Sequence, residues 1–158
     1  MAKILVTYFS QTGNTKAMAE YIAQGAMAAG ADVTLRDISQ IEVDHLLQYD
    51  GIVIGSPTYY GVMAAPIKEL IDRSVKFHGE LTGKVGGAFA SAANIGGGNE
   101  TTILSILQAM LIHGMVIQGA ASGDHYGPVS ISSPDERVRN QCQSLGRRMA
   151  ELTKKLHG

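Results

Sequence analysis

Apolar residues occur along the chain in short continuous runs that alternate with helix-like spacings. Residues 3–9 form a continuous apolar and β-branched run, which is typical of a parallel strand buried on both faces. Apolar positions then recur three and four residues apart over residues 15–29, which predicts a helix that ends near Gly30. Similar patterns predict strands at 32–36, 51–55, 85–91 and 115–121, helices at 65–73 and 100–112, and a short helix or irregular crossover at 41–49. Pro57 has no N–H group to donate and is therefore expected to end the third strand.

The last helix has the strongest local signals. Ser133, Pro134 and Glu136 have the positions of an N-cap, a first helical residue and a capping-box glutamate. Beyond them, intervals of four and three residues predict one buried stripe, formed by Val138, Cys142, Leu145, Met149, Leu152 and Leu156. Five strands that alternate with helices predict an α/β fold, with a doubly wound five-stranded parallel sheet and helices on both faces.

Composition narrows the range of functions. With 158 residues, of which 45% are hydrophobic, the chain is expected to form a single domain over residues 1–158. The formal net charge is −1 and the basic residues are scattered, so we expect no nucleic-acid partner. No apolar stretch approaches the roughly 18 residues of a membrane span, and no signal-peptide pattern is present, so a cytoplasmic protein is expected. The histidines lack metal-ligand spacing, His113 is expected to cap a helix C-terminus, and Cys142 is expected in the core.

The loop after the first strand places three hydroxyl groups and a glycine at a helix N-terminus. Its sequence is Ser10-Gln11-Thr12-Gly13-Asn14-Thr15. Free amides, the helix dipole and the hydroxyl groups favour an anion there, such as a phosphomonoester. The alternative is a polar helix cap without a ligand. Two other nucleotide-binding loops do not fit, because G-x-G-x-x-G is absent after the first strand and residues 79–84, which mimic a P-loop, are followed by a strand.

Two further loops follow predicted strands at the same edge of the sheet. Pro57-Thr58-Tyr59-Tyr60-Gly61 contains adjacent aromatic rings, whose flat apolar faces suit a planar ligand. Ser91-Ala92-Ala93-Asn94-Ile95-Gly96-Gly97-Gly98 ends in three glycines, which allow a ligand to approach the backbone closely. An ordinary turn and a flexible hinge are the respective alternatives. Because ligands bind beyond the carboxyl ends of the strands in an open parallel sheet, three such loops together favour one shared binding site.

These loops resemble those of flavodoxin-like proteins. Residues 10–15 resemble the phosphate loop of flavodoxins, and residues 55–63, 96–103, 113–117 and 126–128 are similar to segments of the WrbA-type NAD(P)H:quinone oxidoreductases. The resemblance extends over nearly the whole chain and implies a flavodoxin-like fold that binds FMN noncovalently. It implies that the phosphate binds at residues 10–15 and that the isoalloxazine ring lies between residues 57–61 and 91–98. The cofactor-binding residues implied in this way are Ser10, Gln11, Thr12, Gly13, Asn14, Thr15, Pro57, Thr58, Tyr59, Tyr60, Gly61, Ser91, Ala92, Ala93, Asn94, Gly96 and Gly97.

The chain also departs from the quinone reductases. Ile112 stands where they have a histidine before His-Gly-Met, the chain contains no tryptophan, and an insertion before the third strand is missing. These differences bear on tetramer formation and on quinone turnover, so the sequence leaves open whether the protein is a homo-oligomer. A flavodoxin that transfers electrons between redox proteins therefore stays an alternative.

The loops expected to face the flavin contain no acidic residue. Residues 56–66 and 86–99 lack Asp and Glu, so little negative charge opposes an anionic reduced flavin. We therefore expect the second electron to enter more easily than in strongly acidic electron carriers, which favours small diffusible substrates. The main prediction is an FMN oxidoreductase that accepts hydride from NAD(P)H and reduces a quinone or similar small acceptor, with no catalytic residue and no metal site identified. A non-redox module that binds a phosphate or a partner protein is the second alternative.

Overall fold

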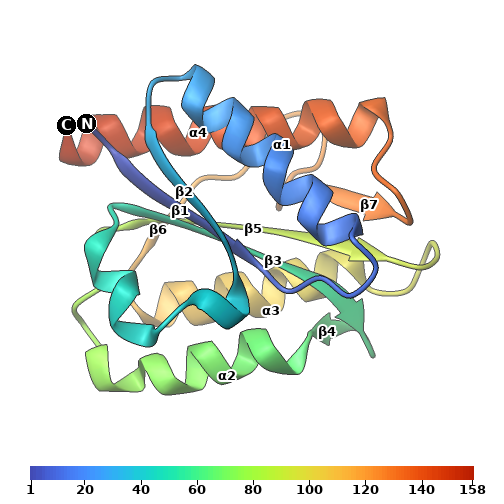
Figure 1. The fold of residues 1–158 in the computed structure, drawn as a ribbon, viewed down its shortest axis with the longest axis horizontal. Helices are drawn as coiled ribbons and strands as arrows, with labels where there is room; N and C mark the ends of the chain where they lie inside the picture. Colours follow the sequence, from blue (N-terminus) through green and yellow to red (C-terminus); the bar gives the residue numbers. More distant parts are fainter.

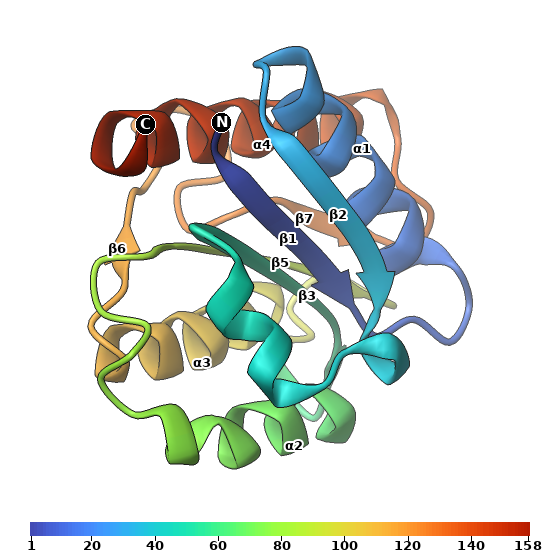
Figure 2. The ribbon, with the colours of Figure 1, turned by 60° about the vertical axis from the view of Figure 1, so that its left-hand side comes forward.

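A computed structural model describes residues 1–158, and helices cover both faces of its central sheet (Figure 1). Helices α1 (Asn14–Ala28) and α4 (Glu136–His157) lie on one face, and α2 (Ala65–Arg73) and α3 (Asn99–Ile112) lie on the other. Three short 3₁₀ helices complete the helical elements, η1 (Ile38–Gln40), η2 (Val43–Gln48) and η3 (Ser74–Phe77). The two chain termini lie near each other (Figure 2). None of the helices combines the length and the apolar character that crossing a membrane requires.

Five parallel strands form the main path of the sheet, in the order β2-β1-β3-β5-β6. The strands are β1 (Lys3–Tyr8), β2 (Asp32–Asp37), β3 (Gly51–Tyr59), β4 (Val62–Met63), β5 (Val85–Ala92), β6 (Val116–Ile117) and β7 (Val129–Ile131). The chain passes from β1 outward to β2 and then returns to the other side of β1 as β3. The winding therefore reverses between β1 and β3, and the predicted doubly wound sheet with helices on both faces is confirmed.

The predicted strand at 115–121 is present but shorter than predicted, because the last position of the sheet is shared by two short strands, β6 and β7. β6 pairs with the first residues of β5, and β7 pairs with its last residues. Residues 118–128 leave the sheet between them. The Ala120 amide donates to the His125 carbonyl at 3.0 Å, so this segment bonds to the loop that follows it and not to β5.

Two predicted boundaries also differ from the structure. β3 does not end at Pro57 but continues to Tyr59. Its pairing with β1 ends at Gly55, whereas its pairing with β5 continues to Pro57. The missing N–H group of Pro57 therefore costs no hydrogen bond to β1. Helix α4 begins after Asp135 rather than after Ser133. The Asp135 Oδ1 atom accepts a hydrogen bond from the Val138 amide at 2.8 Å, and its negative charge suits a helix N-terminus.

Successive residues of the central strands face opposite layers. Ile4 and Val6 of β1 belong to the buried cluster under α1 and α4, whereas Leu5 belongs to the cluster under α2 and α3. Each fully buried aliphatic side chain stabilises the fold by about 1.5–3 kcal/mol. Because both faces are covered in this way, the backbone at the carboxyl ends of β1, β3 and β5 is fixed, and the loops that follow start from a rigid base.

Candidate functional site

A cavity of about 340 Å³ lies where β1, β3 and β5 end, on the right-hand side of Figure 1. This volume falls within the range of small-molecule sites, about 300–1,000 Å³. Eleven residues line it, and ten of them are among the cofactor-binding residues that the sequence predicts. The lining residues are Gln11, Thr12, Asn14, Thr15, Pro57, Thr58, Tyr59, Ser91, Ala92, Ala93 and Ser132. The three loops named from the sequence therefore meet at one cavity.

Helix α1 presents a bare N-terminus to this cavity. Its N-cap, Gly13, has a φ of +94°, a left-handed conformation that glycine adopts without strain, and it offers no side chain to cap the helix. The amide groups of Thr12, Asn14 and Thr15 donate to no acceptor in the structure. Free amides at a helix N-terminus form a ready site for an anion.

Ser10 shapes this loop from outside the cavity. Its Oγ atom accepts hydrogen bonds from the Gly13 amide at 3.2 Å and from the Lys16 amide at 3.3 Å. Gly13 is the N-cap of α1 and Lys16 lies in its first turn, so the hydroxyl satisfies two amides at the start of the helix. Ser10 and Gly13 thus set the shape of the loop, while Gln11, Thr12, Asn14 and Thr15 line the cavity.

Hydrogen bonds join the loops across the cavity. The Thr15 and Ser91 hydroxyl groups lie 2.8 Å apart and are both buried, which links the start of α1 to the end of β5. The Tyr59 hydroxyl donates to Gln11 Oε1 at 2.6 Å, which links the end of β3 to the loop after β1. The Tyr59 ring also contacts Phe9 edge to face, with 6.3 Å between the ring centroids. These contacts hold the walls of the cavity at fixed positions.

The turn between β3 and β4 has an unusual residue at its tip. Tyr60 has a φ of +50° and Gly61 a φ of +82°, and together they join the paired residues Tyr59 and Val62 as a two-residue turn of type I′. Tyr60 is fully exposed and does not line the cavity. Left-handed backbone at a tyrosine and an exposed aromatic ring are both unfavourable, which makes Tyr60 a candidate contact for a ligand above the cavity.

The loop after β5 is exposed beyond Ala92. Ala93 lines the cavity, whereas Asn94, Gly96 and Gly97 do not. The amide groups of Ala93 and Asn94 donate to no acceptor in the structure, so they are free to donate to a ligand. Ile95, at the tip of the loop, is 88% exposed. The loop therefore offers backbone donors and one apolar side chain at the mouth of the cavity.

Two residues of this region did not emerge as candidates from the sequence. Ser132 lines the cavity directly after β7, and it has a φ of +59°, which is rare for a residue with a side chain. Asn99 is buried behind the wall, where its Oδ1 atom accepts from the Thr58 hydroxyl at 3.3 Å and its Nδ2 atom donates to the Ser130 carbonyl at 3.3 Å. Only the placement of β7 beside β5 could have identified Ser132.

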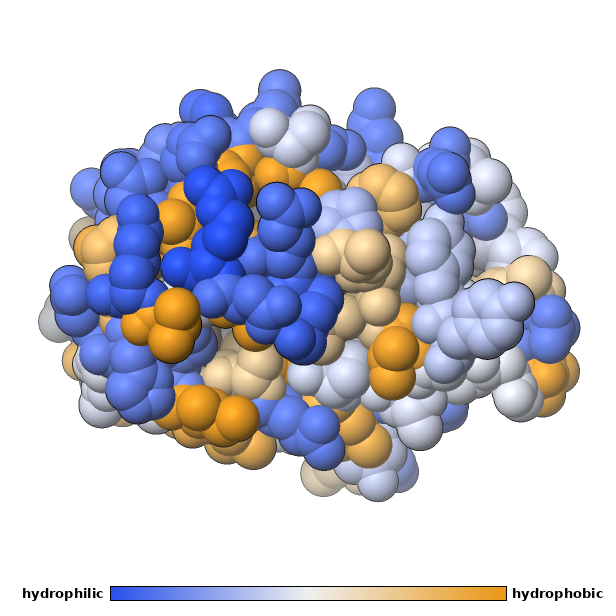
Figure 3. Space-filling model, turned by 90° about the horizontal axis from the view of Figure 1, so that it is seen from below, coloured by the Kyte–Doolittle hydropathy of each residue, from blue (hydrophilic) through white to orange (hydrophobic).

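Charged side chains are absent from the cavity lining. Figure 3 shows the same tendency over a wider area, because the right-hand side, where the strands end, has mostly pale colours, whereas strongly hydrophilic residues gather elsewhere. Nowhere in residues 1–158 do three or more His, Cys, Asp or Glu side chains form a group that could hold a metal ion. The geometry thus suits an anion bound by neutral donors, attached to an uncharged body.

His113 and Cys142 lie away from the cavity. His113 is the C-cap of α3, as predicted, and its Nε2 atom lies 2.7 Å from Ser74 Oγ. Burial, and secondarily the charge of His78, lowers the pKa of His113. Cys142 lies in the core, also as predicted, and burial raises the pKa of its thiol to about 12.

Comparisons with known proteins agree with this geometry. The flavodoxin family model matches residues 6–146. A flavodoxin from Aquifex aeolicus is 38% identical over 160 residues, which cover 96% of this chain and 86% of the relative. An NAD(P)H dehydrogenase (quinone) from Archaeoglobus fulgidus is 35% identical over 190 residues, which cover 99% of this chain and all of the relative. The crystal structure of a WrbA-like flavodoxin from Agrobacterium tumefaciens has a TM-score of 0.83 and 26% identity, with 99% of each chain covered.

Proposed function

The chain belongs to the flavodoxin family, and on this basis we propose that it binds FMN noncovalently and transfers hydride from NAD(P)H to a quinone or a similar small acceptor. The observation that supports this most is the uncharged cavity, in which free amides and hydroxyl groups converge at the N-terminus of α1. FMN supplies the redox chemistry when bound, and the protein binds, orients and tunes it. Residues 1–158 act as one flavodoxin-like domain in this proposal.

The start of α1 fits a phosphate group. The amides of Thr12, Asn14 and Thr15 have no acceptor, and the Thr12 and Thr15 side chains line the cavity beside them. Hydrogen bonds to a charged oxygen are about twice as strong as those between neutral groups. These donors therefore bind a phosphate without a lysine or arginine.

The two following loops fit a planar ring system. Pro57, Thr58 and Tyr59 line one side of the cavity, and Ala92 and Ala93 line another. In our proposal the isoalloxazine ring lies between them, with Tyr60, Gly61, Asn94, Gly96 and Gly97 at its outer edge. Small side chains on one side and an aromatic ring on the other leave space for a flat ligand.

No side chain of the cavity is identified as an acid or a base for the reaction. No Asp, Glu, His, Lys or Arg side chain lines the cavity. Protons that the acceptor needs are therefore taken from solvent, which reaches the mouth of the cavity beside Ile95 and Tyr60, both highly exposed.

A neighbouring cavity helps to locate the approach of the donor. It has a volume of about 530 Å³, and three carboxylates line it together with Arg73, which is already paired with Glu42 at 3.2 Å. Carboxylates repel the diphosphate of a nicotinamide dinucleotide. We therefore place the approach of NAD(P)H, and of the acceptor after it, beside Tyr60 and Ile95, which are highly exposed and do not line the acidic cavity.

The proposal is tested by mixing FMN-loaded protein with NADH or NADPH in a stopped-flow instrument, first alone and then with benzoquinone. Rapid loss of the oxidised flavin absorbance, followed by quinone-dependent consumption of NAD(P)H, is the expected result. If the protein stays colourless after incubation with FMN, it is instead a non-redox module.

A second candidate function is that of an electron carrier between redox proteins. The 38% identical relative from Aquifex aeolicus is a flavodoxin, and the alignment with the Archaeoglobus fulgidus dehydrogenase extends over 190 residues whereas this chain has 158. Segments of that dehydrogenase therefore have no counterpart here. An FMN-loaded protein that barely reacts with NAD(P)H, yet accepts electrons from a reduced redox protein, would favour this candidate.

A further inference from the structure

Strand β7 is a three-residue strand at the open edge of the sheet. The Ala90 amide donates to the Pro128 carbonyl at 3.1 Å, and the Ser132 amide donates to the Ala92 carbonyl at 2.8 Å. Because backbone groups alternate in direction along a strand, Val129 turns its own N–H and C=O groups away from β5. No further strand lies on that side, so these groups need other partners.

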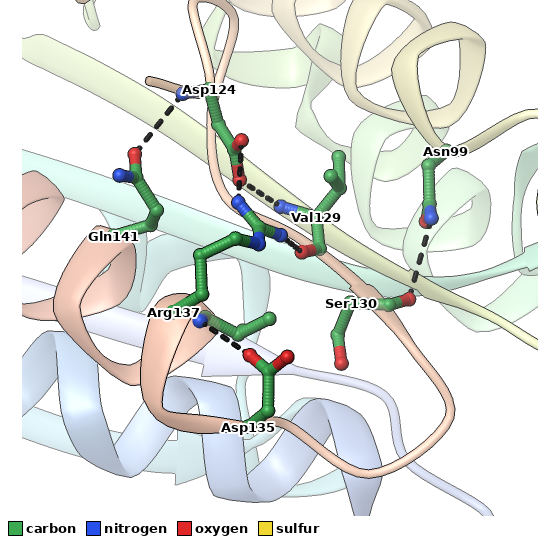
Figure 4. Close-up of polar contacts among 8 residues, drawn as sticks. Asn99, Asp124, Val129, Ser130, Asp135, Arg137 and Gln141 are labelled. Carbon is green, nitrogen blue, oxygen red and sulfur yellow. Dashed lines mark hydrogen bonds and ion pairs between the residues drawn. The ribbon is translucent and has the colours of Figure 1, made fainter. Parts of the chain in front are cut away.

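An ion pair provides both partners (Figure 4). The Val129 amide donates to Asp124 Oδ2 at 3.0 Å, and Arg137 Nη2 donates to the Val129 carbonyl at 2.8 Å. Arg137 Nη1 also donates to Asp124 Oδ1 at 2.9 Å, which closes the ring of contacts. Gln141 Oε1 accepts from the Asp124 amide at 3.0 Å and holds the loop against α4. The Asp124–Arg137 pair thus takes the place of a neighbouring strand.

This arrangement distinguishes the pair from the other ion pairs of the protein. Lys68–Asp72 and Arg73–Glu42 join exposed side chains, with each side chain at least 49% exposed. Arg137 is similarly exposed at 51%, but the Asp124 side chain is only 14% exposed, and the pair bonds directly to backbone groups of the sheet. Exposed pairs contribute little to stability, whereas charge-assisted bonds to a backbone fix its position.

The strand that the pair holds ends at the cofactor cavity. Ser132 follows β7 directly, lines the cavity and has a left-handed backbone. The Ser130 hydroxyl donates to the Ser132 carbonyl at 2.9 Å, and Asn99 bonds to the Ser130 carbonyl from the other side. A three-residue strand has few contacts of its own, so the place of Ser132 depends on the partners of residues 129 and 130.

We propose that Asp124 and Arg137 are positioning residues for the FMN site, which hold β7 in register and thereby keep Ser132 on the cavity wall as a contact of the cofactor. This inference rests on the proposed binding of FMN at the cavity. Neither residue reaches the cavity itself, so both act through Ser132.

The test compares FMN binding by apo-protein variants, measured as quenching of flavin fluorescence. Arg137→Met is expected to weaken FMN binding about tenfold, the order expected if Ser132 loses one hydrogen bond to the cofactor. Ser132→Ala is expected to weaken binding to a similar or smaller extent. If Arg137 acts through Ser132, the two losses do not add. The variant that carries both substitutions then binds FMN about as tightly as whichever single variant has the lower affinity. Lys68→Met, which breaks the exposed pair on α2, serves as the matched control and leaves FMN binding unchanged.

Hydrogen exchange separates positioning from a general loss of stability. Arg137→Met is expected to speed exchange of the Ser132 amide, while the amides of β3 and the first half of β5 keep the wild-type rate. Arg137→Lys retains the positive charge but not the two donors of the guanidinium group. Its FMN affinity should lie between those of the wild-type protein and Arg137→Met.

Two results would overturn this inference alone. One is an FMN affinity of Arg137→Met within twofold of wild type, and the other is a double variant whose loss equals the product of the single losses. A wild-type protein that binds no FMN overturns the proposed function together with this inference.

Discussion

Glycine has different roles in two regions of the protein. Between α1 and α4 it allows two helix backbones to touch, whereas at the carboxyl edge of the sheet it leaves the N-terminus of α1 without a capping side chain. A Cβ atom added at Gly146 would lie 2.0 Å from the Ile22 carbonyl oxygen, and one added at Gly25 would lie 2.1 Å from the Gln143 carbonyl oxygen. A Cβ atom at Gly13 would meet nothing within 4 Å. Close packing thus requires glycine in the first region, and a left-handed φ requires it in the second.

The difference shows how stability and binding are divided within one small fold. Where α1 and α4 cross, Gly25 and Gly146 lie within the helices, whose backbone groups bond along each helix, and the free energy comes from burial. At the edge, amides at residues 12, 14 and 15 lack partners, and Tyr60 and Ser132 have strained backbones. Such costs are tolerated where the surrounding structure is rigid, and they mark a site that a ligand completes.

The largest effect is expected from Gly146→Ala. Helix propensity alone would stabilise α4 by about 1 kcal/mol, but the added methyl group would collide with α1 backbone and force the helices apart. We expect the free energy of unfolding to fall by about 2–3 kcal/mol, measured by urea denaturation. Asn140→Ala, at an exposed position of the same helix, is the control and should cost nothing. Unchanged or increased stability of Gly146→Ala would refute the close contact.

At the edge of the sheet, the opposite outcome is expected from Thr12→Val. Thr12 is exposed and lines the cavity, so its hydroxyl contributes to phosphate binding and little to folding. We expect FMN to bind about tenfold more weakly, while the urea midpoint stays at the wild-type value. Riboflavin, which lacks the phosphate, provides the control, because its affinity should not change. If Thr12→Val loses affinity equally for FMN and riboflavin, the phosphate does not bind at the N-terminus of α1.

A smaller effect is expected when a charge is added to the uncharged rim. Ile95 is 88% exposed, so Ile95→Asp should not disturb the fold. Its negative charge opposes the anionic reduced flavin, and we expect the potential for the second electron to fall by on the order of tens of millivolts. Ile95→Asn is the uncharged control, and added salt should reduce the difference. A very low second potential in the wild-type protein would contradict the role given to the missing carboxylates.

Helices and strands are predicted well from the sequence where their hydrophobic patterns extend over many residues. The apolar run at residues 3–9 and the stripe from Val138 to Leu156 correspond to β1 and α4, because burial over many residues leaves little choice of face. Ten of the eleven cavity residues could be named because parallel strands deliver their following loops to one edge.

The parts that could not be predicted depend on partners distant in sequence. Residues 129–131 are too few to show a period, and they become a strand only because the Asp124–Arg137 pair and β5 satisfy their backbone groups. Ser132 enters the cavity for the same reason. At the start of α4, Ser133 and Asp135 are both suitable caps by local rules, and the observed bond from Val138 to Asp135 decides between them.

Acid should lower the stability of the protein through His113, a half-buried residue at the end of α3. The Ser74 hydroxyl donates to the Ile71 carbonyl at 2.6 Å, so His113 Nε2 must donate to Ser74 at 2.7 Å. His113 Nδ1 is then unprotonated, and it is buried without a partner. Protonation would place an N–H group and a charge there with no acceptor, which agrees with the lowered pKa caused first by burial and then by His78.

The sign of the pH dependence follows from this lowered pKa. Since the folded state binds this proton more weakly than the unfolded state, the free energy of unfolding should decline as the pH falls below the ordinary histidine value of about 6.5. The decline should end once the pH is below the lowered pKa of the folded state. His113→Gln retains a side-chain amide that can donate to Ser74 but cannot titrate, so it should reduce the slope of stability against pH in this range. An equal slope in this variant, measured by urea denaturation at several pH values, would show that another group is responsible.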